Sequence, residues 1–235
     1  MVYKLPSWLD ALSFAILPGE CVLCRLPSGR RRDLCADCEY TLPWLGSCCA
    51  VCALPLATGG ICGQCLRAPP PFATIRAAFC YDTPVDQLIN RFKHRRQPAC
   101  GRILGTLLAD HLEETELPAR PDALIPVPLH WRRHWRRGFN QAEILAWDLG
   151  QRLNLPVLGR ALRRRRRTPA QQGLDARARR RNLRGAFQVR RPLDGLHLAV
   201  VDDVVTTAAT SREVARTLLA AGAATVEIWC LARTP

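Results

Sequence analysis

The segment from residue 198 to residue 210 reads L-A-V-V-D-D-V-V-T-T-A-A-T, with the acids at Asp202 and Asp203. Its first four apolar residues predict a buried strand, and the small and hydroxylated residues after the acids predict a turn into a helix. At the carboxyl end of a parallel strand, such a turn lies where α/β folds bind ligands. Free N–H groups at the helix start can hold a phosphate, and the carboxylates can hold sugar hydroxyls or a Mg²⁺. The alternative is a helix cap with exposed acids.

Strand-like and helix-like stretches alternate around this segment, from Phe72 to the end of the chain. The alternation predicts an α/β fold, with a mostly parallel sheet flanked by helices on both faces. We expect two domains, residues 1–68 and residues 72–235, with the stiff run Pro69-Pro70-Pro71 between them. Residues 1–20 are expected to form an amphipathic helix. The expected strands are 73–81, 123–129, 196–205 and 225–231, and the expected helices are 85–94, 101–116, 140–154 and 210–221.

The first domain is rich in cysteine, because nine of the twelve cysteines lie between residues 21 and 65. Four Cys-x-x-Cys pairs are separated by short loops, and this spacing is typical of structural Zn²⁺ sites with four thiolate ligands. The sequence predicts a small zinc-ribbon-type module with two zinc ions. In sequential grouping the ligands are Cys21, Cys24, Cys35 and Cys38 for one ion, and Cys49, Cys52, Cys62 and Cys65 for the other. A cross-braced grouping, or Cys48 in place of Cys49, stays open.

Arginine dominates the charge of the chain, which has 34 Lys+Arg, 20 Asp+Glu and a formal net charge of +14. Residues 160–191 contain thirteen arginines and a single acid. Like charges at this density repel within a helix, so we expect a loop that becomes ordered on an anion. Pyrophosphate or a nucleic-acid backbone would serve, and the excess of arginine favours single-stranded DNA. An arginine-favouring genome is the alternative. The candidate binding residues are Arg132, Arg133, Arg136, Arg137, Arg163, Arg164, Arg165, Arg166, Arg167, Arg179, Arg180 and Arg181.

Three aromatic residues, Trp131, Trp135 and Phe139, lie among the first group of these arginines. Such rings can stack on bases of a single strand, or they can belong to the core.

Several other classes of protein are excluded or disfavoured. The chain has no apolar stretch long enough for a transmembrane segment, no recognisable secretory signal and no P-loop, so we expect a cytoplasmic protein that is not itself a motor.

The motifs together resemble the ComF family, which includes GntX-like DNA-utilisation and competence proteins. The resemblance covers nearly the whole chain and rests on the cysteine pairs, on I-P-V-P-L at 125–129, on R-R-G-F-N-Q at 136–141, and on residues 165–171, 179–187, 200–210 and 228–233. Within it, the segment at 200–210 is similar to the phosphoribosyl pyrophosphate (PRPP) loop of type I phosphoribosyltransferases. The resemblance therefore implies a phosphoribosyltransferase-like domain behind a double zinc module.

The resemblance also implies roles for particular residues. Asp202 and Asp203 would bind the ribose hydroxyls of PRPP, which would bind together with Mg²⁺. The turn after Pro128 would bind pyrophosphate, and the stretch 168–184 would be a mobile active-site loop. The 5-phosphate would be held by Thr206, Thr207, Ala208, Ala209 and Thr210.

Two departures from related patterns leave the activity open. The family usually has glycine where this chain has Ala208, so a methyl group could interfere with phosphate. Thr206 stands where purine-salvage relatives carry an aspartate base, which argues against purine salvage. Three functions therefore compete. The first is a ComF-type protein of DNA uptake that binds PRPP and single-stranded DNA. The second is a non-catalytic DNA-binding module that serves a helicase or recombination partner, and the third is a nucleotide-salvage phosphoribosyltransferase.

Overall fold

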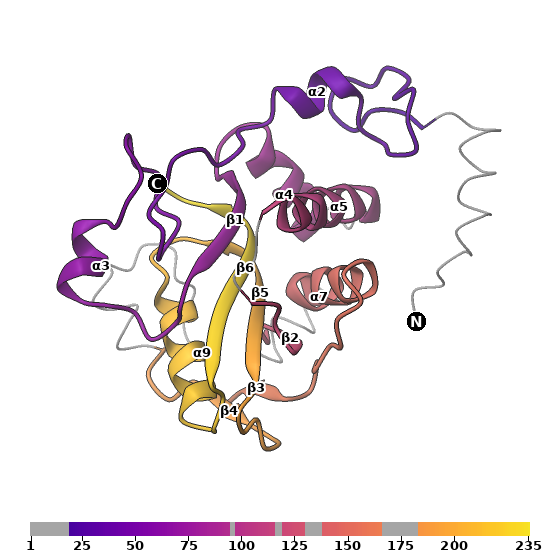
Figure 1. Ribbon diagram of the computed structural model, residues 1–235. Helices are drawn as coiled ribbons and strands as arrows, with labels where there is room; N and C mark the ends of the chain where they lie inside the picture. The colour runs from indigo at the N-terminus through magenta and orange to yellow at the C-terminus, as the bar shows by residue number, and fades with distance from the viewer. Residues whose placement is uncertain (1–18, 95–96, 116–118, 130–137, 166–182) are drawn as a thin grey trace.

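A computed structural model describes residues 19–94, 97–115, 119–129, 138–165 and 183–235 of the chain (Figure 1). Its centre is a four-stranded parallel sheet in the order β1-β6-β5-β2. The strands are β1 (Ile75–Cys80), β2 (Ala123–Pro126), β5 (His197–Val205) and β6 (Thr225–Arg233). Because all four run in the same direction, their carboxyl ends meet at one edge of the sheet.

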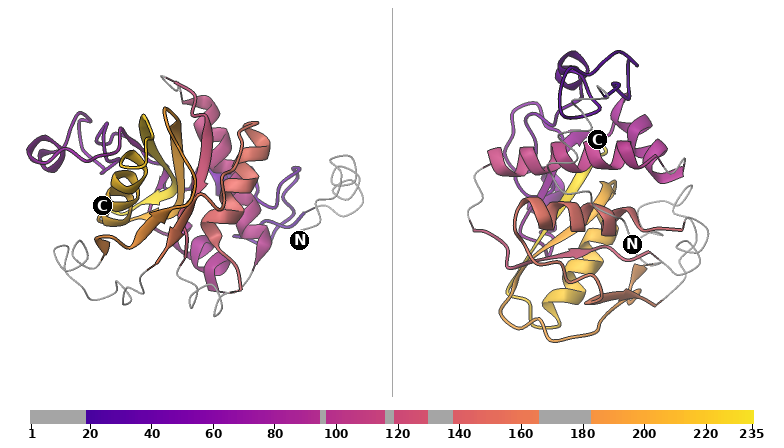
Figure 2. Two further views of the ribbon diagram at one scale, coloured as in Figure 1. Left: turned by 90° about the horizontal axis from the view of Figure 1, so that it is seen from below. Right: turned by 90° about the vertical axis from the view of Figure 1, so that its right-hand side faces the viewer.

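Helices cover both faces of this sheet, as the alternating pattern predicts (Figure 2). One face carries α4 (Val85–His94), α5 (Pro98–Glu114) and α7 (Gln141–Arg152), which bury leucines against Trp229 and Leu231 of β6. The other face carries α9 (Ala209–Leu219), which packs with Ile228 and Cys230 of the same strand. Strands β5 and β6 are therefore apolar on both sides, as buried parallel strands are.

All eight elements expected between residues 73 and 231 are present, with ends that differ by a few residues. The sequence does not predict a second, two-stranded antiparallel sheet of β3 (Leu162–Arg164) and β4 (Phe187–Val189). These strands lie at the two ends of the arginine-rich stretch, so the expectation of a loop throughout this stretch is wrong at both ends. Short strands of three residues carry too little periodicity to stand out among so many arginines.

The cysteine-rich module consists of two lobes, each with one short helix. The first lobe, residues 20–42, contains α2 (Ala36–Tyr40) and rests on α4 and α5. Arg91 of α4 donates to the Val22 carbonyl at 2.8 Å, and Arg32 pairs with Asp110 of α5 at 3.2 Å. The second lobe, residues 48–67, contains α3 (Gly63–Arg67) and shares the apolar core on the α9 side of the sheet. The division into domains at residues 68–72 stays a prediction.

The expected N-terminal helix lies mostly outside the described residues, which begin at residue 19. Over the ranges that the structure describes, no helix has both the length and the apolar character needed to cross a bilayer.

Candidate functional site

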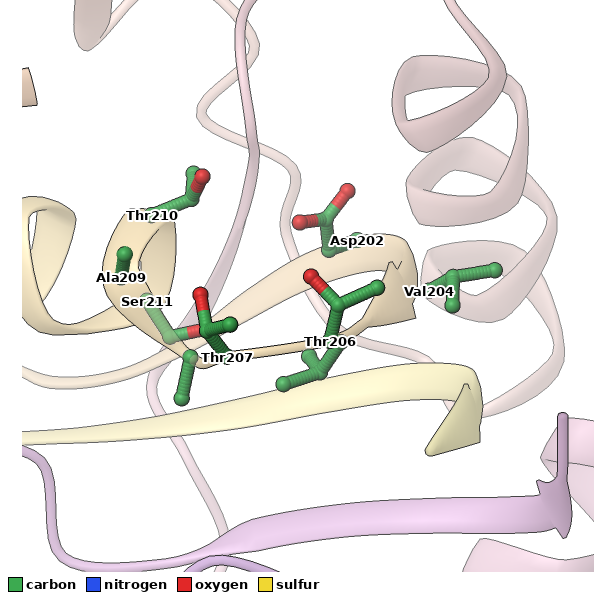
Figure 3. A pocket seen from close by; sticks show the side chains of 9 residues that line it. Asp202, Val204, Thr206, Thr207, Ala209, Thr210 and Ser211 are labelled. Carbon is green, nitrogen blue, oxygen red and sulfur yellow. The ribbon is translucent and has the colours of Figure 1, made fainter. Parts of the chain in front are cut away.

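The carboxyl end of β5 and the start of α9 form a hollow at the edge of the sheet, lined by Asp202 and residues 204–211. Figure 3 shows the carboxylate of Asp202 and the hydroxyls of Thr206 and Thr207 on the same side of this loop. Thr206 and Thr207 are exposed, and Asp202 and Thr210 are partly buried. The residue that caps α9 is Ala208, so the two acids are not helix caps. The hollow thus brings together Asp202 and the hydroxyls that the sequence singled out, beside free N–H groups of a helix start, whereas Asp203 does not line it.

Ala208 adopts the left-handed backbone conformation, with φ +54° and ψ +17°. This region favours glycine, which is the residue that the family resemblance leads us to expect at this position. An alanine there costs roughly 1–2 kcal/mol. The loop therefore keeps a backbone conformation that suits glycine although alanine occupies the position, and Ala208 is buried.

Within the acidic pair, the ionised form of Asp202 is disfavoured. Burial, together with the neighbouring Asp203 carboxylate, raises the pKa of Asp202 to about 7. The Asp203 N–H donates to Asp202 Oδ1 at 2.9 Å, and the charges of Lys93 and Arg164 act in the opposite direction to the burial. Near neutral pH this carboxyl therefore gains or loses its proton in response to small changes in nearby charge.

Sequence reasoning missed Lys93, whose ammonium lies 2.9 Å from Asp203 Oδ2. Both side chains are largely buried, with 16% and 18% of their surface exposed. Lys93 comes from the end of α4, more than one hundred residues before Asp203 in the chain. One signal could have identified it, because Lys93 and Lys4 are the only lysines in a chain that otherwise uses arginine.

The arginines at 163–165, in and just after β3, are not equivalent, although the sequence presents them as one run. Arg164 is buried, with its guanidinium 5.5 Å from the ring centre of Phe187, whereas Arg163 and Arg165 are exposed. This alternation follows from the two-residue period of a strand. Arg164 therefore faces the side of Asp202, whose pKa it influences, and its two neighbours face solvent. The other candidate arginines lie outside the described residues: Arg132, Arg133, Arg136, Arg137, Arg166, Arg167, Arg179, Arg180 and Arg181.

Phe139 belongs to the core, because its ring lies 5.9 Å from that of Phe92 and packs with the buried residues of α4 and α5. The hypothesis that it stacks on bases is therefore not favoured, and the alternative of a core residue holds. Trp131 and Trp135 lie outside the described residues.

The cysteines form two compact groups in the sequential arrangement, with all sulfurs of a group within 4.8 Å of one another. The groups are Cys21, Cys24, Cys35 and Cys38, and Cys49, Cys52, Cys62 and Cys65. Among the residues that the structure describes, a cross-braced arrangement does not occur, and Cys48 belongs to neither group.

The donor sets fit Zn²⁺ closely. A tetrahedral ion with Zn–S bonds of about 2.3 Å requires sulfurs about 3.8 Å apart. The Sγ atoms of Cys24 and Cys35 are 3.8 Å apart, and those of Cys52 and Cys62 are 3.7 Å apart. Burial raises the pKa of Cys49, but backbone N–H donors of Cys62 and Cys52 outweigh it and lower the pKa to about 6. Such donors stabilise a thiolate, which is the form that binds metal. In the same group, burial and the neighbouring thiols raise the pKa of Cys52 and Cys65. Because all four positions of each group are cysteines, both sites are of the closed, structural kind.

Comparison with known proteins agrees with this architecture. Residues 12–66 match the double zinc ribbon domain family. The chain is 40% identical over 224 residues to DNA utilization protein YhgH of Salmonella typhi, covering 93% of this chain and 98% of the relative. It is 34% identical over 212 residues to competence protein F of Haemophilus influenzae, covering 86% and 91%. Competence protein ComFC of Bacillus subtilis is 27% identical over 213 residues, covering 86% and 84%.

Among solved structures, the chain is similar to purine phosphoribosyltransferase of Pyrococcus horikoshii, at 19% identity and a TM-score of 0.32, covering 57% of this chain and 74% of that one. It is also similar to UMP synthase of Leishmania donovani, at 20% identity and a TM-score of 0.37, covering 59% and 23%.

Proposed function

Because this chain belongs to the ComF family of DNA-utilisation and competence proteins, we propose that it binds PRPP with Mg²⁺ at residues 202–211 and single-stranded DNA on an arginine-rich surface beside them. The observation that carries the first half is the hollow at the end of β5. It combines the carboxylate of Asp202, a row of threonine hydroxyls and the N-terminus of an eleven-residue helix. Each of these groups recognises a different part of a ribose phosphate. Asp203 follows Asp202 in β5 but does not line the hollow, and its carboxylate pairs with Lys93.

The phosphate end of the ligand would be held by N–H groups of residues 207–211 and by the hydroxyls of Thr206, Thr207 and Thr210. The positive end of the α9 dipole adds attraction for the anion. Asp202 and Asp203 accept hydrogen bonds from vicinal ribose hydroxyls. This assignment uses every polar side chain that lines the hollow except Ser211, which is buried.

Mg²⁺ fits the same residues, because carboxylate and hydroxyl oxygens are the hard ligands that it prefers. Asp202 and Asp203 would hold it, directly or through water. When bound, it supplies positive charge to the leaving pyrophosphate. Asp203 exchanges its partner Lys93 for the ligand, and the released ammonium then becomes available to a second anionic group. We propose that Lys93 takes the pyrophosphate end.

The chemistry that such a site supports is displacement of pyrophosphate from C1 of the ribose by an acceptor nucleophile. The bond from the acceptor to C1 forms as the bond from C1 to the pyrophosphate oxygen breaks, and positive charge develops on the sugar. Carboxylates beside the ribose stabilise that charge, and Lys93 and Arg164 stabilise the leaving group. Thr206 offers no carboxylate to act as a base toward a purine. The proposal therefore covers PRPP binding and displacement of its pyrophosphate, and Thr206 argues against a purine as the acceptor.

The second half of the proposal draws support from Arg163 and Arg165, which are exposed on either side of the buried Arg164. Exposed guanidinium groups contact phosphates of a nucleic-acid backbone through one or two hydrogen bonds. The names of the relatives, DNA utilization protein and competence protein, point to the same class of ligand. A helicase or recombination protein as partner remains an expectation from the family resemblance.

Titration with PRPP and Mg²⁺ tests the first half. We expect saturable heat or fluorescence changes with the wild-type protein, and at least a tenfold weaker affinity in Asp202→Asn/Asp203→Asn. Asp194→Asn, an exposed acid outside the hollow, is the matched control and keeps wild-type affinity. Absence of binding in wild-type protein that holds its zinc would contradict the proposal.

A further inference from the structure

Arg233, the last residue of β6, is buried with 6% of its surface exposed, between two parts of the chain that are far apart in sequence. Its Nε donates to the carbonyl of Cys52 at 3.0 Å. Its Nη1 donates to the carbonyls of Thr206 at 2.5 Å and Val205 at 3.3 Å, and also to that of Thr234. A single guanidinium therefore donates hydrogen bonds to the backbone of Cys52, an expected zinc ligand in the second lobe, and to the backbone of residues 205 and 206 in the loop before α9.

The Cys49–Cys52 turn is attached to the sheet at three consecutive carbonyls. The hydroxyl of Thr74 donates to Ala50 at 2.9 Å, and the N–H of Ile75 donates to Val51 at 2.9 Å. The third is the bond from Arg233 to Cys52. The first two bonds fix the turn against the start of β1, and only the third extends toward the carboxyl edge where the ligand site lies. Among these three bonds, the one from Arg233 therefore links the turn directly to the loop at residues 205 and 206.

The positive charge of Arg233 means that negative charge on either side of it is favourable. Within the described part of the chain, no carboxylate forms an ion pair with its guanidinium, and the groups that accept its hydrogen bonds are neutral carbonyls. A buried cation without an anion is costly. The two sides on which it donates hydrogen bonds adjoin two expected sources of negative charge. Four thiolates with one Zn²⁺ would carry a formal charge of −2, and the other source is a phosphate bound at residues 206–211. Each of them stabilises the same guanidinium in the same position.

We propose that Arg233 is a positioning residue through which zinc retention in the second lobe and anion binding at residues 206–211 reinforce each other. The part of this inference that concerns anion binding rests on the proposed binding of PRPP. Because coupling between two sites is reciprocal, a bound ligand must retain the second zinc ion as strongly as that ion favours the ligand. The first lobe is attached to α4 and α5 through Arg91 and Arg32, and within the described residues no hydrogen bond joins it to residues 205–211, so its zinc ion is the comparison site.

The effect of the bound ligand on zinc retention is tested by measuring the release of zinc into a chelating indicator. We expect saturating PRPP with Mg²⁺ to slow the release of one zinc ion per chain by at least threefold and to leave the other unchanged. Cys24→Ser/Cys38→Ser, which removes the first site, identifies the slowed ion as the second. Arg233→Met abolishes the slowing, and Arg233→Lys restores part of it, because an ammonium reaches fewer of the four carbonyls. Arg76→Met removes another largely buried arginine, bonded to Glu227, and keeps the effect. Equal slowing of both ions, or of neither while PRPP is bound, would overturn the inference.

Hydrogen exchange tests the link without any ligand, and so separates its failure from failure of PRPP binding. Compared with Arg76→Met, the Arg233→Met variant should exchange at least tenfold faster in two peptides, one covering residues 49–54 and one covering residues 205–211. If only one of the two peptides changes, or neither, Arg233 does not couple the lobe to the loop.

Discussion

The ammonium of Lys93 lies 2.9 Å from Asp203 Oδ2, so the acidic pair at the end of β5 has a positive partner from α4, a helix distant in sequence. This pair neutralises one of the two carboxylates while the other, Asp202, is pushed toward its protonated form. In the resting site Lys93 therefore neutralises Asp203 while the buried Arg164 lies on the side of Asp202, and a ligand that needs both carboxylates competes with Lys93.

The first prediction concerns this ion pair. Lys93→Met leaves Asp203 partly buried without its partner, and we expect a loss of about 2 kcal/mol in the free energy of unfolding. Asp203→Asn alone is also destabilising, whereas the double variant should lose less than the sum, with a coupling energy of about 1–2 kcal/mol. Urea denaturation of the four proteins measures this coupling. Additive losses would mean that the two groups do not interact.

The second prediction concerns the left-handed backbone of Ala208. Glycine adopts this conformation without strain, so Ala208→Gly should raise the stability of the protein by about 1 kcal/mol. Ala209→Gly is the matched control, because Ala209 is the first residue of α9, and it should lower stability by up to about 1 kcal/mol. Thermal unfolding of the two variants gives shifts of opposite sign. Destabilisation by Ala208→Gly would contradict the strain argument.

The third prediction is a pH dependence from Asp202, whose pKa is raised to about 7 by burial and by Asp203. The unfolded value is about 3.9, so between these values the native protein holds a proton that the unfolded chain does not. The contribution of this proton to stability is complete below about pH 4 and is lost as the pH rises through 7. Asp203, Lys93, Arg164 and Cys230 face this carboxyl and shape its titration.

Asp202→Asn removes this dependence and leaves the zinc sites unaltered. From pH 5.5 to pH 8, the stability of the variant should therefore rise relative to wild type, by roughly 1–2 kcal/mol. Denaturant unfolding at several pH values measures the difference, in which the common titration of the thiols cancels. A difference that stays constant over this range would show that Asp202 is ionised throughout.

The fourth prediction distinguishes the adjacent cysteines 48 and 49. The purified protein should contain two zinc ions per chain, and Cys49→Ser should contain one. Cys48→Ser should keep both, because Cys48 belongs to neither group of four. Elemental analysis gives the counts. A single ion in wild type, or loss of an ion in Cys48→Ser, would refute the two-site arrangement.

The fifth prediction tests the DNA surface through salt dependence. Each phosphate that is no longer neutralised by an arginine should reduce the slope of log affinity against log salt by about 0.7 for a single strand. Replacing the exposed Arg163 and Arg165 by alanine should therefore lower the slope by about 1.4. Replacing Arg102 and Arg152, which are exposed on α5 and α7, removes the same charge and should leave the slope unchanged. Equal effects of the two double variants would indicate only a general response to net charge.

Local spacing was sufficient for much of this architecture. The paired cysteines predict both zinc sites because two residues of a Cys-x-x-Cys turn place their sulfurs together wherever the turn lies. The apolar run ending at Asp202 and Asp203 predicts β5, its loop and α9, because strand and helix periodicities are properties of neighbouring residues. The family resemblance also pointed to an unusual backbone at Ala208, because it leads us to expect glycine there.

The tertiary structure decided which distant residues complete the site. Lys93 reaches Asp203, and Arg233 reaches both Cys52 and Thr206, only because a parallel sheet gathers strand ends from separate parts of the chain at one edge. Likewise, the strand pairing of β3 with β4 separates the buried Arg164 from its exposed neighbours. A run of identical arginines contains no signal of which one faces inward. That choice depends on a backbone direction set by hydrogen bonds to residues more than twenty positions away.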